Sequence, residues 1–340
     1  MNATDKGGAS AQVVDVHAHF MSADLVDLVA TFDDPRWPRL EAGIDAGTIM
    51  TGDKTFRPVK PPCWDVAHRI QDLDEHGVDQ QVLSPIPVTL TYWARPDEAA
   101  AYARLQNDAL AQAVAEGSGR FLALGGVPLQ DVDLAIEEMM RAKNELGLSG
   151  LEIGTLVDGL ELDDPSLLPF FEAAAQERVP IFIHPTEGAT VTRRSGLPYD
   201  FGTGMHTDTS LAASALVFGG VLDKCSDLRV GLAHGCGAFP WSYPRMRYMA
   251  GGLLGQDSAA LDDAVASMWV DSLVFDPAHV PLLVERFGAN HIMLGSDDPF
   301  LPHSLADPRA PIEGARDAGT LSEAEADAAL GANTLAFLTA

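Results

Sequence analysis

The chain of 340 residues has few basic residues and very few cysteines. Lys and Arg number 22 against 49 Asp and Glu, which gives a formal net charge of -27 at pH 7. A surface this acidic repels nucleic acid and anionic lipid, because binding either needs clustered cations. Three cysteines, Cys63, Cys225 and Cys236, are too few and odd in number for a disulfide framework. We therefore expect no nucleic-acid partner, no membrane partner and no disulfide scaffold.

Long apolar runs and export signals are also missing. No hydrophobic stretch approaches the length needed to cross a bilayer, and the polar start MNATDKGGASAQ lacks the order of a signal peptide. These absences predict a soluble protein of the cytoplasm. No glycine-rich GxGxxG segment follows the first predicted strand, which disfavours a dinucleotide-binding doubly wound sheet but leaves an open sheet as an alternative.

Short β-branched or apolar runs alternate with amphipathic stretches along the chain. Eight such runs predict strands, at residues 13–17, 81–84, 121–127, 150–153, 181–184, 229–233, 269–275 and 291–295. The segments between them predict helices at 64–76, 96–116, 132–146, 165–178, 209–224 and 277–287, with a further one near residue 239. Buried strands alternating with helices indicate parallel βαβ units. Eight of them predict an α/β fold, a distorted (β/α)8 TIM barrel.

Two segments are longer than ordinary loops. Residues 20–63 follow the first strand and predict a cap over the barrel mouth, and residues 185–208 predict a lid. The tail at 321–338 predicts two short helices that pack on the barrel. We interpret residues 1–340 as a single barrel domain, because α/β barrels of this length commonly form one unit.

Histidine or aspartate closes several of the predicted strands. His17 and His19 alternate along the first strand, so their side chains point to one side and can share an ion. His184 closes the fifth strand, His234 follows the sixth and Asp297 follows the eighth. Each residue alone is also compatible with a structural role. Together they would encircle one point at the carboxyl face of the barrel, which carries the active site in this fold.

This ordered pattern resembles the metal-dependent amidohydrolase superfamily from about residue 13 to the end. Within it, the chain is similar to the decarboxylase family typified by 2-amino-3-carboxymuconate-6-semialdehyde decarboxylase. The segments that carry this resemblance are HAHF at 17–20, TIMTG at 48–52, FRPV at 56–59, WDVAHRIQDLDEHGVDQQV at 64–82, VPLQD at 127–131, IFIHP at 181–185, AHGCGAFP at 233–240 and MLGSDDPF at 293–300.

The resemblance implies a role for each residue of this pattern. His17, His19, His184 and Asp297 would hold a divalent metal, with zinc as the first choice and manganese as an alternative. His234 would be the catalytic base, and its alternative is a fourth ligand or a structural histidine. Asp297 would also help to hold the charge that develops in the reaction. The metal would lower the pKa of a bound water to about 7, and no organic cofactor would be needed.

The substrate implied by the resemblance is a small carboxylate. Arg57, in FRPV, would grip the carboxylate bidentately, and Arg245 would be supplied by the neighbouring subunit of a homodimer. The expected reaction is the nonoxidative decarboxylation of an unsaturated or aromatic acid from ring catabolism. The alternatives are a hydrolase or hydratase that uses the same activated water, and a noncatalytic metal-binding protein.

Several residues depart from the family pattern. Thr186 follows IFIHP where the family has an aromatic residue, so the substrate can differ. His206 and Asp208 lie in the predicted lid, where they either bind another acid group or, as we favour, are solvated loop residues. Cys236 replaces a glycine beside His234, and we interpret it as a packing residue because nothing marks its thiol as reactive.

Overall fold

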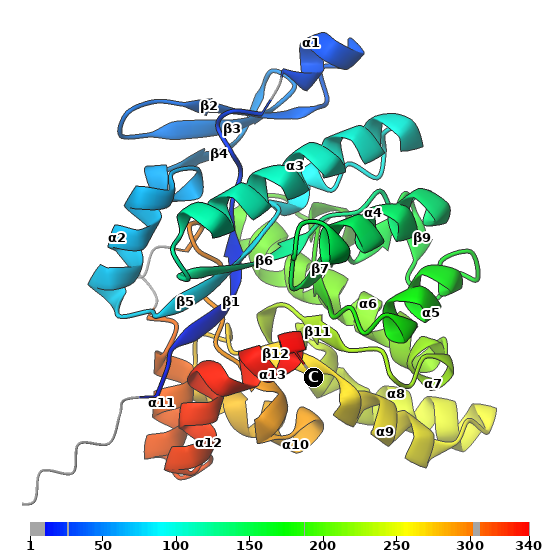
Figure 1. Cartoon of the computed structure of the whole chain (residues 1–340). Coiled ribbons are helices and arrows are strands. Elements are labelled where there is room, and N and C mark those ends of the chain that lie inside the picture. Colours follow the sequence, from blue (N-terminus) through cyan, green and yellow to red (C-terminus); the bar gives the residue numbers. More distant parts are fainter. Residues whose placement is uncertain (1–10, 26, 187, 302–306, 340) are drawn as a thin grey trace, which may run out of the picture.

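The computed structural model of the chain describes residues 11–339, except 26, 187 and 302–306. Its central feature is a sheet of eight parallel strands surrounded by helices (Figure 1). In spatial order the strands are β1 (Val14–His19), β5 (Gln80–Ser84), β6 (Phe121–Gly125), β7 (Gly150–Gly154), β10 (Ile181–His184), β11 (Val230–Leu232), β12 (Trp269–Asp271) and β13 (Ile292–Met293). Each predicted strand has its counterpart, in the predicted order along the chain.

Main-chain hydrogen bonds bring the first and last strands together. The Val16 amide donates to the carbonyl of Leu294 at 2.9 Å, and the His19 amide donates to that of Asp298 at 2.7 Å. The amide of Asp297 in turn donates to the carbonyl of His17 at 2.9 Å. The sheet is therefore a nearly closed barrel, as predicted, and the open-sheet alternative is wrong.

Two strands, β1 and β13, end at other residues than predicted, and both ends lie next to the candidate metal ligands. β1 extends to His19, two residues beyond the prediction, because it pairs with β5 as far as Ser84. β13 is shorter than predicted and ends at Met293. Asp297 therefore lies in the loop beyond β13, which is tied to β1 by hydrogen bonds and not by a regular ladder.

The helices between the strands begin and end at recognisable signals. The Asp65 side chain accepts a hydrogen bond from the His68 amide at the start of α2, and Gly77, with φ +62°, ends that helix. Proline in the first turn and two acidic residues behind it favour the start of α3, because they suit the free amides and the helix dipole there. These helices are α2 (Val66–His76), α3 (Pro96–Glu116), α4 (Val132–Asn144), α5 (Leu168–Gln176), α6 (Met205–Phe218), α7 (Val221–Lys224), α8 (Phe239–Arg247), α9 (Ser258–Ser267) and α10 (Val280–Phe287).

Short 3-10 and π-helical turns join several of these elements. They are η1 (Pro61–Cys63), η2 (Pro87–Thr89), η3 (Gly188–Val191), η4 (Pro198–Gly204), η5 (His234–Cys236), η6 (Tyr248–Leu253), η7 (Pro277–His279), η8 (Ala289–His291) and η9 (Ala328–Ala332). The predicted lid is thus partly helical, and its described part runs through η3 and η4 into α6. Residue 187 of the lid lies outside the described residues.

The segment after β1 forms a small antiparallel sheet. It contains α1 (Leu28–Phe32), β2 (Pro38–Ala42), β3 (Gly47–Thr51) and β4 (Lys54–Val59), with β3 between the other two strands. This sheet lies beyond one end of the barrel, near α3 (Figure 1). A second, two-stranded sheet pairs β8 (Leu156–Val157) with β9 (Leu160–Glu161). None of these strands was predicted from the sequence.

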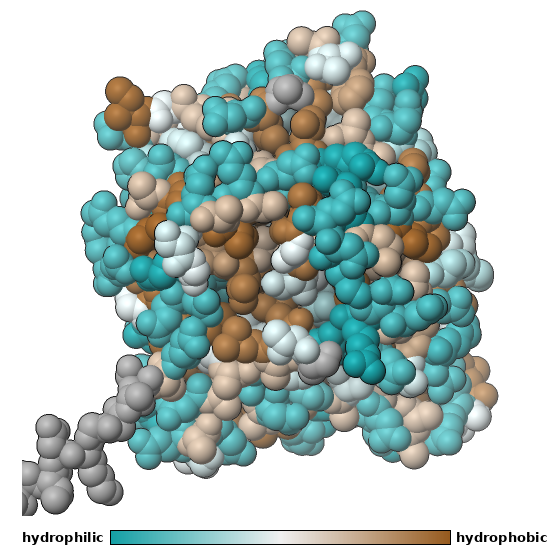
Figure 2. Space-filling model, in the orientation of Figure 1, coloured by the Kyte–Doolittle hydropathy of each residue, from teal (hydrophilic) through white to brown (hydrophobic). Residues whose placement is uncertain are grey.

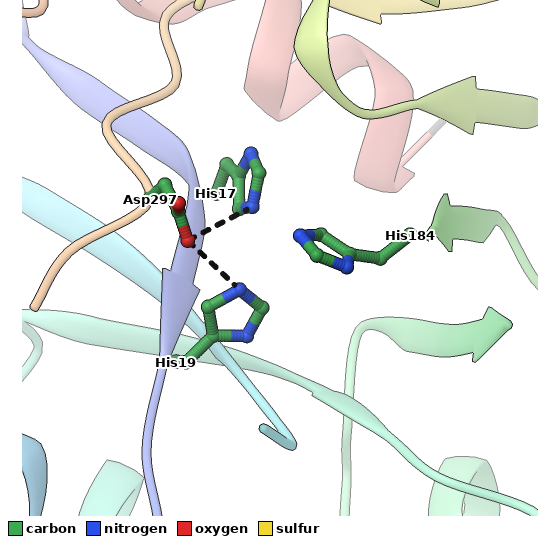
Figure 3. A group of neighbouring side chains, drawn as sticks. All are labelled: His17, His19, His184 and Asp297. Carbon is green, nitrogen blue, oxygen red and sulfur yellow. Dashed lines mark ion pairs between the residues drawn. The ribbon is translucent and has the colours of Figure 1, made fainter. Parts of the chain in front are cut away.

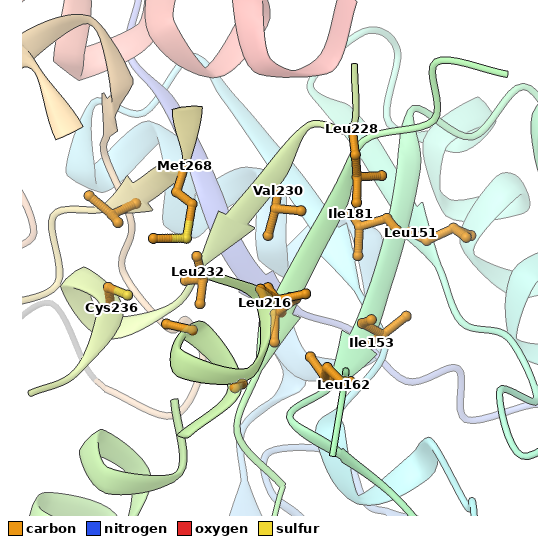
Figure 4. Packing of buried hydrophobic residues seen from close by; sticks show 14 of the residues in the cluster. Leu151, Ile153, Leu162, Ile181, Leu216, Leu228, Val230, Leu232, Cys236 and Met268 are labelled. Carbon is orange, nitrogen blue, oxygen red and sulfur yellow. The ribbon is translucent and has the colours of Figure 1, made fainter. Parts of the chain in front are cut away.

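The hydrophobic core lies between the strands and the surrounding helices. Figure 4 shows part of it, where strand residues such as Ile153, Ile181 and Leu232 lie near Leu216 of α6. The tail contributes α11 (Ala310–Asp317), α12 (Glu323–Asp327) and α13 (Asn333–Thr339). Phe337 of α13 packs in a second buried cluster with residues of the barrel strands, as predicted for the tail.

Hydrophilic residues cover much of the face shown in Figure 2, in keeping with the acidic composition. Among the described residues, no helix has the length and apolar character needed to cross a membrane.

Candidate active site

Four side chains from distant parts of the sequence meet at one end of the barrel. His17 and His19 come from β1, His184 ends β10, and Asp297 lies in the loop after β13. One potential ligand atom from each side chain lies within 4.8 Å of the others (Figure 3). These are the four residues predicted to bind a metal, and the barrel topology brings them together.

The orientation of the three imidazoles suits a metal ion. His17 Nδ1 lies 2.7 Å from a carboxylate oxygen of Asp271, His19 Nδ1 lies 2.8 Å from the Pro85 carbonyl, and His184 Nδ1 lies 2.8 Å from the Pro185 carbonyl. Each Nδ1 can therefore donate a proton outward, and in the neutral ring this leaves the lone pair on Nε2 facing the cluster. All three Nε2 atoms are buried and lack a hydrogen-bond partner among the described residues.

The carboxylate completes this set of donors. Asp297 Oδ1 lies 3.3 Å from Nε2 of His19 and 3.7 Å from Nε2 of His17. Burial by itself would raise the pKa of Asp297, but the interactions with the neighbouring imidazoles of His19 and His17 outweigh it and lower the pKa. The donor set is thus three nitrogens and one ionised oxygen, which matches the ligands that zinc binds in proteins.

Two of the candidate ligand histidines have pKa values shifted in opposite directions. Burial lowers the pKa of His17, but the hydrogen bond and charge of Asp271 outweigh this and raise it to about 9. Burial, together with the neighbouring imidazoles, holds the pKa of His184 well below its usual value. In the metal-free protein the cluster therefore holds a proton on His17 at neutral pH, and a bound cation would have to displace it.

His234 lies beside the four candidate ligands but in a different kind of environment. Its ring centroid is 5.3 Å from that of His17 and 5.1 Å from that of His184. Burial, followed by the charge of His17, lowers the pKa of His234 to about 4, so the ring is neutral at pH 7. A neutral imidazole next to a metal site can accept a proton, as the predicted catalytic base must.

The backbone around His234 explains the sequence AHGCG. Residues 234–237 all have positive φ angles, between 57° and 66°. A Cβ atom at Gly235 would lie 2.5 Å from Val274 Cγ1, and one at Gly237 would lie 2.2 Å from the carbonyl oxygen of His206. The two glycines therefore permit a tight turn that has no room for a side chain at either of their positions. This turn presents His234 to the site.

Asp271 is an important residue that the sequence analysis missed. It is fully buried at the end of β12, where it accepts hydrogen bonds from the His234 amide and the Gly235 amide, both at 2.9 Å. Together with its contact to His17, this makes Asp271 a common support for a metal ligand and for the His234 turn. An acid at the carboxyl end of the seventh strand could have marked Asp271 as a site residue. The strand was predicted to continue to residue 275, so Asp271 was placed inside it and not at its end.

A buried ionic network holds the loop that carries Asp297. The Arg69 guanidinium lies 3.1 Å from the Asp298 carboxylate and donates to the Gln81 side chain and the His19 carbonyl, both at 2.7 Å. Both charged side chains of this pair are almost completely buried. Removing one partner of such a pair is costly, so the network fixes the last loop against β1. No motif or periodicity along the chain pointed to this network.

A cavity of about 430 Å³ opens beside this cluster and is lined mainly by apolar side chains. Arg57 of β4 is its only Lys or Arg side chain among the described lining residues. The Arg57 guanidinium donates to the Phe300 carbonyl at 2.9 Å and lies over the rings of Phe201 and Phe300. The small antiparallel sheet after β1 therefore supplies the cation of the cavity, and this is the arginine predicted to bind a carboxylate.

Arg245 lies away from the cavity in this chain. It is exposed on α8 and does not line the cavity.

Asp208 differs from the favoured interpretation, because it is buried in the first turn of α6 and accepts a hydrogen bond from Thr155 at 2.5 Å. The description of Asp208 as a solvated loop residue is thus wrong. The helix starts at Met205 because η4 continues directly into it.

His206 was likewise described as a solvated loop residue, and this too is wrong. Its side chain is half-buried and lines the cavity.

Cys236 is completely buried, which raises the pKa of its thiol well above the usual value. Its predicted packing role agrees with this environment, because the reactive form of cysteine is the thiolate.

Comparisons with known proteins agree with this architecture. The amidohydrolase family model matches residues 14–339. The 2-amino-3-carboxymuconate-6-semialdehyde decarboxylase of Dictyostelium discoideum is 36% identical over 332 residues, which cover 96% of this chain and 91% of that protein.

Two solved structures share the fold at lower sequence identity. The IDCase of Metarhizium anisopliae in its apo form superposes with a TM-score of 0.82 at 22% identity, over 96% of this chain and 97% of that chain. The 5-carboxyvanillate decarboxylase of Novosphingobium aromaticivorans, complexed with manganese and 4-hydroxy-3-methoxy-5-nitrobenzoic acid, gives a TM-score of 0.75 at 20% identity and covers 97% and 96% of the two chains. The chain therefore belongs to the amidohydrolase family and, within it, to the group of proteins similar to 2-amino-3-carboxymuconate-6-semialdehyde decarboxylase.

Proposed function

We propose that the protein is a metal-dependent nonoxidative decarboxylase, a carboxy-lyase, that acts on an unsaturated or aromatic carboxylic acid. The observation that carries this proposal is the convergence of three unpartnered imidazole nitrogens and one carboxylate beside a mainly apolar cavity. An apolar cavity with a few polar groups suits a flat, unsaturated acid.

His17, His19, His184 and Asp297 would hold the divalent metal. When bound, such an ion polarises substrate oxygens and activates water. The nitrogen-rich donor set favours zinc. Manganese is the alternative, because the 5-carboxyvanillate decarboxylase structure holds that metal. Metal analysis of the purified protein, followed by reconstitution with each ion, distinguishes the two.

The remaining residues of the site have complementary tasks. The Arg57 guanidinium would bind the substrate carboxylate through two parallel hydrogen bonds. His234, neutral at pH 7, would accept and return a proton at the reacting carbon or at water. Since Arg57 comes from β4, residues 20–63 would act as the cap of a single functional domain and complete its binding site.

We also propose a homodimer in which Arg245 of the partner subunit reaches the cavity. The support is an exposed apolar face on α8 and η6, where Trp241 is 83% exposed, Leu254 is 78% exposed and Tyr248 and Leu253 are also exposed. Exposed apolar patches commonly mark protein interfaces, and Arg245 lies on the same helix. The cytoplasmic location expected from the sequence stays a prediction.

Subunit mixing tests the dimer and its shared site. An Arg57→Gln subunit and an Arg245→Gln subunit are each expected to form homodimers with a raised KM, which are therefore weakly active at substrate concentrations well below KM. If Arg245 acts in trans, a mixed dimer has one site with both arginines intact, and activity returns on mixing. Light scattering that shows a monomer, or mixing that restores no activity, would contradict the proposal.

The decarboxylase proposal is tested by product analysis. The metal-loaded protein is incubated with 2-amino-3-carboxymuconate-6-semialdehyde and with a series of hydroxybenzoates, and carbon dioxide and the remaining acid are measured. Release of carbon dioxide in equal amount to the acid consumed is the expected result. A product that keeps every carboxylate of the substrate would instead indicate a hydrolase or hydratase, and would overturn the proposal.

A further inference from the structure

Three polar side chains of the cavity, those of Thr186, Asp200 and His206, have no task in the proposed reaction. Of the polar groups that line it, His184 and Asp297 belong to the metal site, His234 is assigned as the base and Arg57 as the carboxylate ligand. His206 lines the same cavity from the first turn of α6. Within the described residues, its imidazole makes no hydrogen bond or ion pair.

The backbone of His206 is held firmly against the turn that carries His234. The carbonyl oxygen of His206 accepts hydrogen bonds from the Ala238 amide at 3.3 Å and from the Ser210 hydroxyl at 2.7 Å. The same oxygen lies where a side chain at Gly237 would clash. His206 is therefore placed relative to His234 by direct contacts, and not by a long loop.

The two rings lie next to each other without interacting through hydrogen bonds. Their planes are nearly parallel, at 16°, and their centroids are 6.1 Å apart. His234 Nδ1 has no hydrogen-bond partner among the described residues, so no direct bond links it to His206. This arrangement does not provide a direct proton relay between the two imidazoles. It leaves the polar atoms of His206 available to a molecule in the cavity.

The charge of the surroundings indicates which group His206 can bind. Burial is the main reason that the pKa of His206 is lowered, so the ring is neutral at pH 7 and offers one donor and one acceptor. A neutral imidazole does not compensate a second carboxylate, and Asp200, which also lines the cavity, opposes one. A hydroxyl group can pair with either ring nitrogen.

We propose that His206 is a specificity-determining residue that hydrogen-bonds a hydroxyl substituent on the carboxylate substrate. The protein then prefers hydroxylated aromatic acids to the same acids without the hydroxyl. This inference deepens the proposed function and rests on it for the identity of the cavity as the substrate site. Thr186 and Asp200 are the other polar lining groups, and among the described residues no hydrogen bond joins either side chain to the His234 turn.

Equilibrium binding tests the proposal without requiring turnover. Dissociation constants of benzoate, 3-hydroxybenzoate and 4-hydroxybenzoate are measured by calorimetry on the metal-loaded protein, and recovery of each acid is checked afterwards. One hydrogen bond predicts a preference of about 2- to 13-fold for at least one hydroxybenzoate. His206→Leu should remove that preference and leave the affinity for benzoate unchanged, whereas His206→Gln should restore part of it.

The control is His68→Leu, which changes an exposed histidine of α2 outside the cavity and should leave the preference intact. An equal loss of affinity for all three acids in His206→Leu, or a preference that survives this change, would overturn the role of His206. So would a wild-type protein without any preference. If the preference behaves as expected but no acid in the wider series releases carbon dioxide, the decarboxylase proposal fails while the binding role of His206 stands.

Discussion

Asp271 Oδ2 lies 2.7 Å from His17 Nδ1 and 2.9 Å from the backbone nitrogen of His234. One buried carboxylate thus orients a candidate metal ligand and, at the same time, the turn that carries the candidate base. Such supporting carboxylates fix the tautomer and direction of a ligand histidine. This relationship explains why an acid is needed at the end of β12, where no metal ligand lies.

Asp271→Asn is expected to weaken metal binding by about 10- to 100-fold, because an amide lacks the charge and the second acceptor oxygen. Competition with a chelator measures the dissociation constant. Asp257→Asn is the control, since Asp257 caps α9 at the surface and asparagine caps a helix equally well. A dissociation constant equal to that of the wild type would show that Asp271 does not support the site.

Metal uptake at pH 8 should release close to one proton. The pKa of His17 in the metal-free protein is about 9, so below that pH the ring carries a proton that must leave before Nε2 can bind an ion. Asp271→Asn removes the interaction that raises this pKa, and fewer protons should be released. Calorimetry in buffers of different ionisation enthalpy counts them. Equal release by the two proteins would contradict the raised pKa.

His234→Asn should lower kcat by about 100- to 10,000-fold, the usual contribution of a general base, while metal content stays at the wild-type level. Asparagine suits this position because it tolerates the positive φ angle of His234 better than most residues. Metal analysis and turnover are measured on the same sample. Simultaneous loss of the ion would identify His234 as a ligand instead of a base.

Arg57→Gln is expected to raise KM for the carboxylate substrate with little change in kcat. The loss corresponds to about 2 kcal/mol, or roughly 30-fold, as for hydrogen bonds between charged groups. The KM of Arg57→Lys should lie between those of the wild type and Arg57→Gln, because an ammonium keeps the charge but not the planar pair of donors. Arg36→Gln, at an exposed ion pair in the cap, is the control. An unchanged KM in Arg57→Gln rules out the assigned contact.

Gly237→Ala should lower the free energy of unfolding by more than Gly255→Ala does. Both glycines have positive φ angles, +60° and +74°, and an alanine in this region costs about 1–2 kcal/mol. Only Gly237 adds a clash, since a Cβ there would meet the His206 carbonyl oxygen at 2.2 Å, whereas Gly255 has open space around it. Chemical denaturation measures both. Equal destabilisation by the two substitutions would mean that the turn at Gly237 can shift to accommodate a Cβ atom at no extra cost.

The sequence by itself determined the order of the elements and which residues form the candidate metal-binding cluster. Alternating apolar runs and helices specify the barrel, and the carboxyl ends of its strands necessarily meet at one face, so His17, His184 and Asp297 could be placed together from their positions alone. Helix bounds such as those of α3 followed from local signals, namely a proline in the first turn and acidic residues next to it.

Only the tertiary structure decided what supports and surrounds these residues. The contacts of Asp271, the ion pair of Arg69 with Asp298 and the approach of His206 to the His234 turn join residues that are far apart in the sequence or on different elements. No periodicity or motif encodes such contacts, because they depend on how buried side chains pack in three dimensions. The small sheet of the cap was missed for a related reason, since its short, partly exposed strands show no clear alternation of apolar and polar residues.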